Sequence, residues 1–317
     1  DTSLTDKKIA LSVELVTKNA WENSLVTQLD EIPFYYVGKG EQCVIKTELA
    51  LAKRTSKNAS IILLEEPENH LSHTRLNQLI KCISKQYAEK QILISTHSSF
   101  VVNKLGLSKV MLLDNLRITK FSELSEDTYN FFKKIAGYDT LRMILCKKAI
   151  LCEGDSDELV IQKAYMQVND GRLPIEDGVE VISVGVSFLR FLEIADCINT
   201  KIAVVTDNDG DMEAINKKYE KYIGQNQNDY IKICVDEDID TGSLKIGNSN
   251  YNYNTLEPKL LKVNGLEKLN HVFGTKYKKE DDLRKFMKHN KTECGLKIFE
   301  SSEEIIIPEY IMEAIRW

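Results

Sequence analysis

The chain has 317 residues, a length typical of about two domains. Apolar residues make up 43% and charged residues 28%, as in soluble globular proteins, so a sizeable core is possible. The formal net charge of −6 excludes a surface coated in positive charge. It does not exclude DNA binding, because an acidic site and a basic groove can lie side by side.

The cysteines indicate a reducing compartment. They are odd in number and no two form a CxxC pair, which disfavours a structural zinc site and favours buried free thiols. They are Cys43, Cys82, Cys146, Cys152, Cys197, Cys234 and Cys294. No apolar stretch approaches the roughly 18 residues of a membrane span, and we expect no signal peptide. We therefore expect a cytoplasmic protein.

The first region, 1–115, predicts part of an α/β domain. Residues 61–66 (IILLEE), 91–96 (QILIST) and 109–114 (KVMLLD) are short apolar runs that predict buried strands. Segment 74–87 predicts a helix, because its apolar residues fall on one helical face. Those residues are Leu76, Leu79, Ile80 and Ile83. This alternation predicts a parallel sheet covered by helices.

A connector is expected at 116–146, polar and then amphipathic, and a second α/β domain at 147–317. Strands are predicted at 149–152, 179–184, 201–206 and 230–235, alternating with helices at 156–168, 187–197 and 211–223. This is a doubly wound, Rossmann-like pattern. Segment 236–254 is rich in Gly and Asn and predicts a loop, and the tail beyond it is mostly helical.

Polar residues follow two predicted strands of the first region. Glu65 and Glu66 end the strand at 61–66, and His97 follows the next one. Ligands bind at this edge of α/β sheets, and two adjacent acids there suit Mg²⁺ coordination and water activation. Upstream, GKGEQ (38–42) is predicted to be a loop that enters a helix, a natural phosphate contact.

In this order, the strings resemble the second half of an ABC-type ATPase of the SMC kind. The resemblance implies that GKGEQ is the signature loop, Glu65 the metal-binding acid, Glu66 the catalytic base and His97 the switch histidine, with a D-loop at PENHLS. It implies nucleotide contacts from Gly38, Gly40, Glu41, Gln42, Glu65, Glu66 and His97. A plain α/β domain would explain any one string, but not four in this order.

One ATPase element is missing. The sequence holds no GxxxxGK[ST] loop, which cradles the phosphates of ATP. We therefore expect very weak ATP binding by these residues alone. Either the upstream half of the domain is absent from this chain, or the protein is a nucleotide-independent relative. The start at Asp1, in what looks like the middle of a domain, favours the first explanation.

Four acids are predicted to converge in the second region. Glu153 ends one strand and Asp157 lies on the next helical turn, while Asp207 and Asp209 follow a second strand. Such crowding of like charge is costly without a cation. Two Mg²⁺ or Mn²⁺ ions about 3.5–4 Å apart would relieve it and could clamp a phosphodiester. Three neighbouring acids are alternative ligands: Asp155, Glu158 and Asp211.

The ordered pair of motifs, EGxxD and then TDxD on strand ends, resembles the TOPRIM domain of topoisomerases, primases and certain nucleases. An ABC-type ATPase followed by TOPRIM is similar to the OLD (overcoming lysogenization defect) family of nucleases. That resemblance implies Glu257 as a later metal-site acid and Lys291 as an active-site lysine. The plainer interpretation of Lys291 is an exposed helix residue.

The resemblance implies an ATP-regulated, metal-dependent DNA endonuclease or nickase of anti-phage defence. It implies a homodimer or higher oligomer formed through the ATPase domain, and a helicase or reverse transcriptase as defence partner. The Lys- and Arg-rich segment 276–291 could contact phosphates, or could simply be a solvated helix face.

Two alternatives stay open. An SMC-like DNA clamp with an inactive TOPRIM domain would bind DNA without cutting it, although the four acids together argue against inactivation. A primase or topoisomerase would also use TOPRIM metals. The ATPase half fits neither, and the cysteines offer no zinc module of the primase type.

Overall fold

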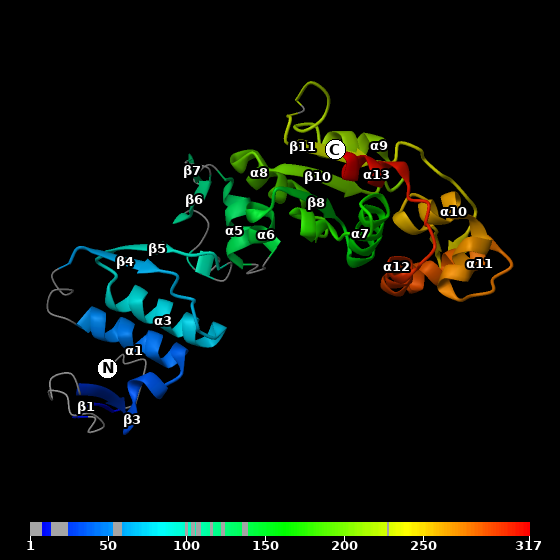
Figure 1. Cartoon of the computed structure of the whole chain (residues 1–317). Coiled ribbons are helices and arrows are strands. Elements are labelled where there is room, and N and C mark those ends of the chain that lie inside the picture. Colours follow the sequence, from blue (N-terminus) through cyan, green and yellow to red (C-terminus); the bar gives the residue numbers. More distant parts are fainter. Residues whose placement is uncertain are drawn as a thin grey trace. The chain divides into compact units, whose positions relative to one another are not determined.

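The structure is a computed structural model. It describes residues 8–13, 25–52, 59–98, 101–102, 105, 109–114, 117–121, 124–134, 139–226 and 228–317. Asp1, whose position motivated the expectation of a missing upstream half, lies outside these residues, as do 122–123 and 135–138 of the predicted connector. The chain divides into two compact units, Asp1–Leu105 and Gly106–Trp317 (Figure 1). The predicted domain boundaries at residues 115 and 146 stay predictions.

The first unit combines a small antiparallel sheet with a parallel strand pair. Its elements are β1 (Ile9–Val13), β2 (Leu25–Leu29), β3 (Ile32–Pro33), η2 (Phe34–Tyr36), α1 (Lys39–Ala52), β4 (Ile61–Glu65), α3 (His73–Gln86) and β5 (Gln91–Ser95). Strands β4 and β5 pair in parallel, as predicted. The apolar face of α3 is buried, and Leu76 and Ile80 pack with Val101 and Ile94.

The GKGEQ segment differs from its predicted loop. Helix α1 begins at Lys39, so Gly40 lies in its first turn. A Cβ atom at Gly40 would stand 2.5 Å from the carbonyl oxygen of His70, which leaves no room for a side chain. The helix therefore lies directly against the turn that follows β4. The glycine serves this close approach, which a sequence pattern does not distinguish from a loop.

The strand predicted at 109–114 is also different. Strand β6 (Met111–Asp114) pairs antiparallel with β7 (Arg117–Lys120) in the second unit, and Leu113 is 75% exposed. It is therefore not a third strand of the parallel sheet. Strands β4 and β5 are not fully buried as predicted either, since Leu63 is 73% and Leu93 40% exposed. A short apolar run does not say which partner a strand takes, and here the partner is the next strand in the chain.

The second unit holds a four-stranded parallel sheet of order β11-β10-β8-β9. Its remaining elements are α5 (Glu126–Lys134), α6 (Asp139–Leu145), β8 (Lys148–Cys152), α7 (Asp155–Val168), η4 (Pro174–Asp177), β9 (Val179–Ser183), α8 (Phe188–Ile198), β10 (Lys201–Thr206), α9 (Met212–Lys218), η5 (Gly224–Asn226), β11 (Ile231–Val235), β12 (Lys245–Ile246), β13 (Ser249–Asn250), α10 (Leu256–Phe273), α11 (Glu280–His289), α12 (Lys291–Glu300) and α13 (Glu309–Arg316).

The strand order explains how the fold brings two motifs together. Strands β8 and β10 are apolar runs, 149–152 and 202–205, with both faces buried, as parallel central strands require. They are neighbours although β9 lies between them in sequence. Because β9 and β10 lie on opposite sides of β8, right-handed crossovers place α7 and α8 on opposite faces of the sheet. The carboxyl ends of β8 and β10 therefore meet at one edge.

The predicted connector packs within the second unit. The carboxylate of Glu193 on α8 accepts hydrogen bonds from the backbone and hydroxyl of Ser125 and from the hydroxyl of Thr128. Arg190 lies over the Phe131 ring, 4.5 Å from its centre. These contacts dock α5 on α8.

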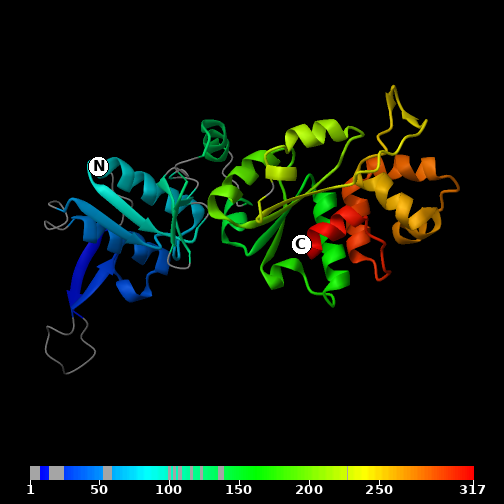
Figure 2. The same ribbon diagram turned by 90° about the horizontal axis from the view of Figure 1, so that it is seen from above.

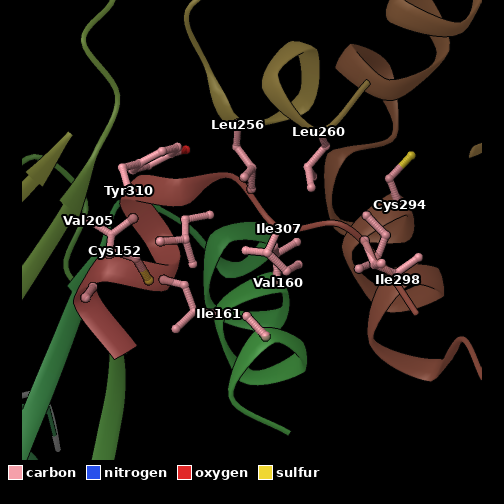
Figure 3. Packing of buried hydrophobic residues seen from close by; sticks show 14 of the residues in the cluster. Cys152, Val160, Ile161, Val205, Leu256, Leu260, Cys294, Ile298, Ile307 and Tyr310 are labelled. Atoms are coloured by element: carbon pink, nitrogen blue, oxygen red, sulfur yellow. The ribbon is translucent and has the colours of Figure 1, made fainter. Parts of the chain in front are cut away.

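The C-terminal helices share one core with α7 and the sheet (Figure 3). Its buried side chains include Cys152, Val160, Ile161, Val205, Leu256, Leu260, Cys294, Ile298, Ile307 and Tyr310. Figure 2 shows α10, α11 and α12 gathered beyond one end of the sheet, with the chain from β11 running to them. No helix among the described residues is both long and apolar enough to cross a membrane.

Helices α12 and α7 approach closely at Gly295. A Cβ atom there would lie 3.1 Å from Cα of Ser156 and 3.3 Å from its carbonyl oxygen. Gly295→Val is expected to push the helices apart and lower the free energy of unfolding by about 1–3 kcal/mol, the usual cost of overpacking. Urea unfolding followed by circular dichroism measures it. Leu296→Ala, at a residue 44% exposed on the same helix, should change stability far less, and equal effects would contradict this packing.

Candidate metal centre

Two strand ends bring Glu153 and Asp207 to one edge of the sheet. Glu153 follows β8 directly and Asp207 follows β10. The two strands are neighbours and parallel. The hydroxyl of Thr206, the last residue of β10, donates to Oε1 of Glu153 at 2.9 Å. The predicted convergence of the EG and DxD motifs is thus present.

Asp157 joins them from the first turn of α7. The chain turns at Gly154, and the Gly154 N–H donates to Oδ2 of Asp157 at 3.1 Å. Burial raises the pKa of Asp157 to about 7, and the charges of Glu257 and Glu153 add to the shift while Lys291 opposes it. Loss of hydration is the larger cause of this shift, and the neighbouring carboxylates add to it.

Asp207 is the most strongly affected acid. Burial raises its pKa to about 9, with further contributions from the negative charges of Asp157, Glu153, Glu257 and Asp209. No described residue donates a hydrogen bond to its carboxylate. A partly buried acid that is surrounded by acids and has no hydrogen-bond donor is a natural place for a cation.

Asp209 has an unusual backbone. Its φ of +50° lies in the left-handed region, which is uncommon for a residue other than glycine. The amide of Asn252 donates to Oδ1 of Asp209 at 2.7 Å. The buried Asn208 accepts from Gly210 N–H and donates to the carbonyl oxygen of Asp238 at 3.1 Å. The DxD turn is thus tied to the segments that follow β11.

Glu257 and Lys291 form a pair at the same site. Glu257 is buried in the first turn of α10, and Nζ of Lys291 lies 2.9 Å from its Oε1. The hydroxyl of Thr255 donates to its Oε2 at 3.1 Å. Burial lowers the pKa of Lys291, but the charge and hydrogen bond of Glu257, together with the charges of Asp157 and Asp207, outweigh it, so the pKa is raised. Lys291 therefore carries a positive charge at neutral pH, with its side chain half exposed.

The carboxylate oxygens of this cluster are suitable ligands for a divalent cation. Among the described residues, no group of three His, Cys, Asp or Glu side chains is arranged so that it could hold a metal ion without some movement. The oxygen donors are those that Mg²⁺ and Mn²⁺ prefer. Burial raises the pKa of Asp157 and Asp207, and neighbouring acids raise it further, so a bound cation would favour their ionised forms. The residues that could hold such an ion are Glu153, Asp157, Asp207 and Asp209, with Glu257 beside them.

Other residues have different roles. Of the three alternative acids, Asp211 caps helix α9, its Oδ1 accepting from Ala214 N–H at 2.9 Å, and Glu158 accepts from Gln162 at 3.2 Å. Thr206 and Asn252 were not predicted for the site. Thr206 directly precedes the predicted acid Asp207, and this position in the sequence could have identified it. Asn252 has none, because its contact spans 43 residues along the chain.

In the first unit, Glu66 and His97 meet at the ends of β4 and β5. Nδ1 of His97 is 3.4 Å from a Glu66 oxygen, and Asn69 donates to the other oxygen at 2.8 Å. Glu68 accepts from the Thr96 hydroxyl at 2.6 Å and from His97 N–H at 3.2 Å. The histidine is therefore fixed beside Glu66, whereas Glu65 ends β4 with an exposed side chain.

Two residues of the GKGEQ segment, Glu41 and Gln42, make contacts within the first unit. The buried amide of Gln42 donates to the carbonyl oxygens of Phe34 and Val37 at 2.9 and 2.8 Å, so this donor is already used. Glu41 lies 3.5 Å from Arg75 of α3. Gly38 has open space around it. Nucleotide contacts from Gly38, Gly40, Glu41 and Gln42 stay predictions.

Comparison with known families defines the class. Residues 24–103 match the family model of an AAA domain, described as putative AbiEii toxin, Type IV TA system. Residues 144–209, which carry Glu153, Asp157, Asp207 and Asp209, match a TOPRIM family model. The chain therefore contains an AAA-type ATPase domain and a TOPRIM domain. The TOPRIM model is that of the overcoming lysogenization defect protein-like domain, so this domain is OLD-like.

Solved structures of one OLD protein resemble the chain. They show the C-terminal region of the Xanthomonas campestris pv. campestris OLD protein, in crystals phased with platinum, mercury and iodine. Their sequence identities are 19%, 18% and 17%, and their TM-scores 0.38, 0.36 and 0.33. They cover 55%, 54% and 54% of this chain and 93% of each matched chain. No curated protein matches the chain.

Proposed function

We propose that the TOPRIM domain is a divalent-metal-dependent DNA endonuclease or nickase and that the AAA-type domain couples it to ATP. One observation carries the proposal. The acids of an OLD-like TOPRIM domain stand at the ends of two adjacent parallel strands, and burial and mutual repulsion raise the pKa of Asp157 and Asp207. Such a charge cluster suits metal-bound phosphate chemistry.

We assign metal binding to the acids of the cluster and stabilisation of phosphate charge to Lys291. Glu153, Asp157, Asp207 and Asp209 would hold Mg²⁺ or Mn²⁺, with Glu257 beside them. The bound metal supplies Lewis-acid stabilisation of the phosphate and an activated water. Lys291, anchored 2.9 Å from Glu257, keeps its positive charge and would stabilise the negative charge that builds on the phosphate.

The ATPase roles are proposed from the first unit. Glu65 would bind the nucleotide's metal, Glu66 would act as the base for the attacking water, and His97 would sense the γ-phosphate. Because the sequence holds no GxxxxGK[ST] loop, these residues need a phosphate-binding loop from elsewhere. We also propose assembly of at least two copies through this domain and a role in anti-phage defence, with a helicase or reverse transcriptase as partner.

Supercoiled plasmid tests the proposal. The wild type is expected to nick it with Mg²⁺ or Mn²⁺ and not with EDTA, and Glu153→Ala should lose the activity. Glu213→Ala removes one exposed carboxylate on α9 and should keep it. DNA binding without cutting under either metal, with ATP and added partner proteins, would instead favour an SMC-like clamp. Primer synthesis or strand passage would favour a primase or topoisomerase.

A DNA contact near the site is predicted at Lys288. Its ammonium lies 5.9 Å from the centre of the Tyr251 ring. The next residue along the chain, Asn252, donates to Asp209. Lys288→Glu is expected to weaken DNA binding and reduce the slope of log affinity against log salt by about one. Fluorescence anisotropy across a salt series measures it. Lys217→Glu on α9 makes the same charge change, and an equal loss there would mean that only net charge matters.

A further inference from the structure

Asn252 is the one donor to Asp209 that the described residues supply. Asp209 is exposed and its backbone has a φ of +50°. Its carboxylate Oδ1 accepts from Nδ2 of Asn252 at 2.7 Å. An exposed aspartate has several rotamers, and a metal ligand must keep one of them. The hydrogen bond from Asn252 selects the rotamer in which Asp209 points toward the segment after β13.

The orientation of the Asn252 amide is itself determined. Its Oδ1 accepts from Asn254 N–H at 2.9 Å, which leaves Nδ2 as the atom that faces Asp209. Asn254 is held in turn by Asp240, whose N–H donates to its Oδ1 at 2.7 Å and whose carbonyl oxygen accepts from its Nδ2 at 2.9 Å. Both ends of the Asn252 side chain are therefore used, one for anchoring and one for Asp209.

The residues on either side fix the position of Asn252. The rings of Tyr251 and Tyr253 meet edge to face, with centres 5.1 Å apart. The Tyr253 hydroxyl accepts from Leu244 N–H at 3.2 Å, and Arg284 lies over the same ring at 5.3 Å. At Gly242 a Cβ atom would stand only 2.2 Å from the Tyr253 ring. The segment 251–254 is thus held in place by side-chain packing and hydrogen bonds on both sides of Asn252.

We propose that Asn252 is a positioning residue of the metal site, which keeps Asp209 in the orientation needed for metal binding. The inference rests on the proposed function. Asn252 acts through Asp209 and does not touch the metal or the DNA. Hydrogen-bond partners of metal ligands typically contribute 10- to 100-fold to metal affinity or activity, which sets the size of the expected effect.

The test measures Mn²⁺ binding directly, by electron paramagnetic resonance of free Mn²⁺ during a titration. Asn252→Ala is expected to weaken the affinity at least about tenfold, with unchanged circular dichroism. Asn250→Ala, an exposed residue of β13, is the matched control and should bind Mn²⁺ as the wild type does. If Asn252→Ala does not fold, Asn252→Ser keeps a polar side chain that is too short to reach Asp209.

A double variant separates positioning from a general structural role. Mn²⁺ should bind Asp209→Ala with Asn252→Ala no more weakly than Asp209→Ala alone, because Asn252 acts through Asp209. The half-saturating Mn²⁺ concentration for plasmid nicking should rise with Asn252→Ala while the rate at saturating metal is retained. Wild-type affinity in Asn252→Ala, or additive losses in the double variant, would overturn the inference. A wild type that binds no Mn²⁺ would instead overturn the proposed function.

Discussion

Asp207→Asn is expected to abolish metal-dependent plasmid cutting and, at the same time, to make the metal-free protein more stable. The loss of activity should reach about a thousandfold, because a metal ion contributes several kcal/mol to the transition state and each 1.36 kcal/mol is a factor of ten. The gain in stability has a separate cause. Asparagine resembles protonated aspartate in shape but cannot ionise, so it removes the share of Asp207 in the repulsion among the clustered acids.

The pH dependence follows from the same pKa. The folded protein holds the Asp207 proton up to about pH 9, whereas in the unfolded chain it is released near pH 4. Between these values the native state binds more protons, so the stability of the metal-free wild type should fall as pH rises. Asp207→Asn should flatten this fall and raise the melting temperature at pH 8 by several degrees, at about 2–4 °C per kcal/mol.

Thermal unfolding in EDTA and in Mg²⁺ at pH 5 and pH 8 measures both effects. Mg²⁺ should raise the melting temperature of the wild type at pH 8 and leave that of Asp207→Asn almost unchanged, since ligands stabilise the state that binds them. Asp229→Asn, a change of the same chemistry at an exposed position before β11, is the control. A variant at Asp207 that is less stable than the wild type in EDTA at pH 8 would contradict the repulsion.

Lys259→Met is expected to lower the free energy of unfolding by about 3–5 kcal/mol, the usual cost of breaking a buried ion pair. Only 3% of the Lys259 side chain is exposed. Its ammonium lies 2.8 Å from a carboxylate oxygen of Asp236 and 2.7 Å from one of Asp240, and it donates to the carbonyl oxygen of Asp238 at 2.7 Å. Without it Asp236 would lose its ion pair, and Asp240 would keep only the exposed Lys262.

Lys262 provides a matched control on the same helix, and it shares Asp240 with Lys259. Its side chain is 48% exposed and lies 2.8 Å from Asp240 and 3.5 Å from Asp238. Lys262→Met should cost no more than about 1 kcal/mol, because water screens exposed pairs. Urea unfolding of both variants compares them. Equal losses would mean that burial of Lys259 is not what stabilises the 236–254 segment.

The sequence predicts the strands of the TOPRIM sheet well, for a physical reason. A strand buried on both faces must be apolar throughout, so β8 and β10 stand out as uninterrupted runs, and residues 201–206 were predicted with the observed bounds. The acids Glu153 and Asp207 follow these runs immediately. Their approach needs only parallel strands and the sheet order, which the α/β alternation favours.

Contacts that join distant segments could not be predicted. The side-chain amide of Asn252 donates to Asp209 because the segment after β13 folds back toward the DxD turn. Nothing in the sequence near either residue indicates that the two are in contact. The hairpin of β6 and β7 shows the same limit, since strand propensity does not choose a partner. Gly40 was predicted in a loop, because glycine marks both turns and close helix approaches.

Crystals soaked in Mn²⁺ test most directly whether the carboxylate cluster is a metal site. An anomalous difference map shows where the ion binds without reference to activity. We expect a peak among the carboxylates of Glu153, Asp157, Asp207 and Asp209, and no such peak in crystals of Asp207→Asn. A peak at the acids 236–240 instead, or an empty cluster at saturating Mn²⁺, would contradict a TOPRIM metal centre in this protein.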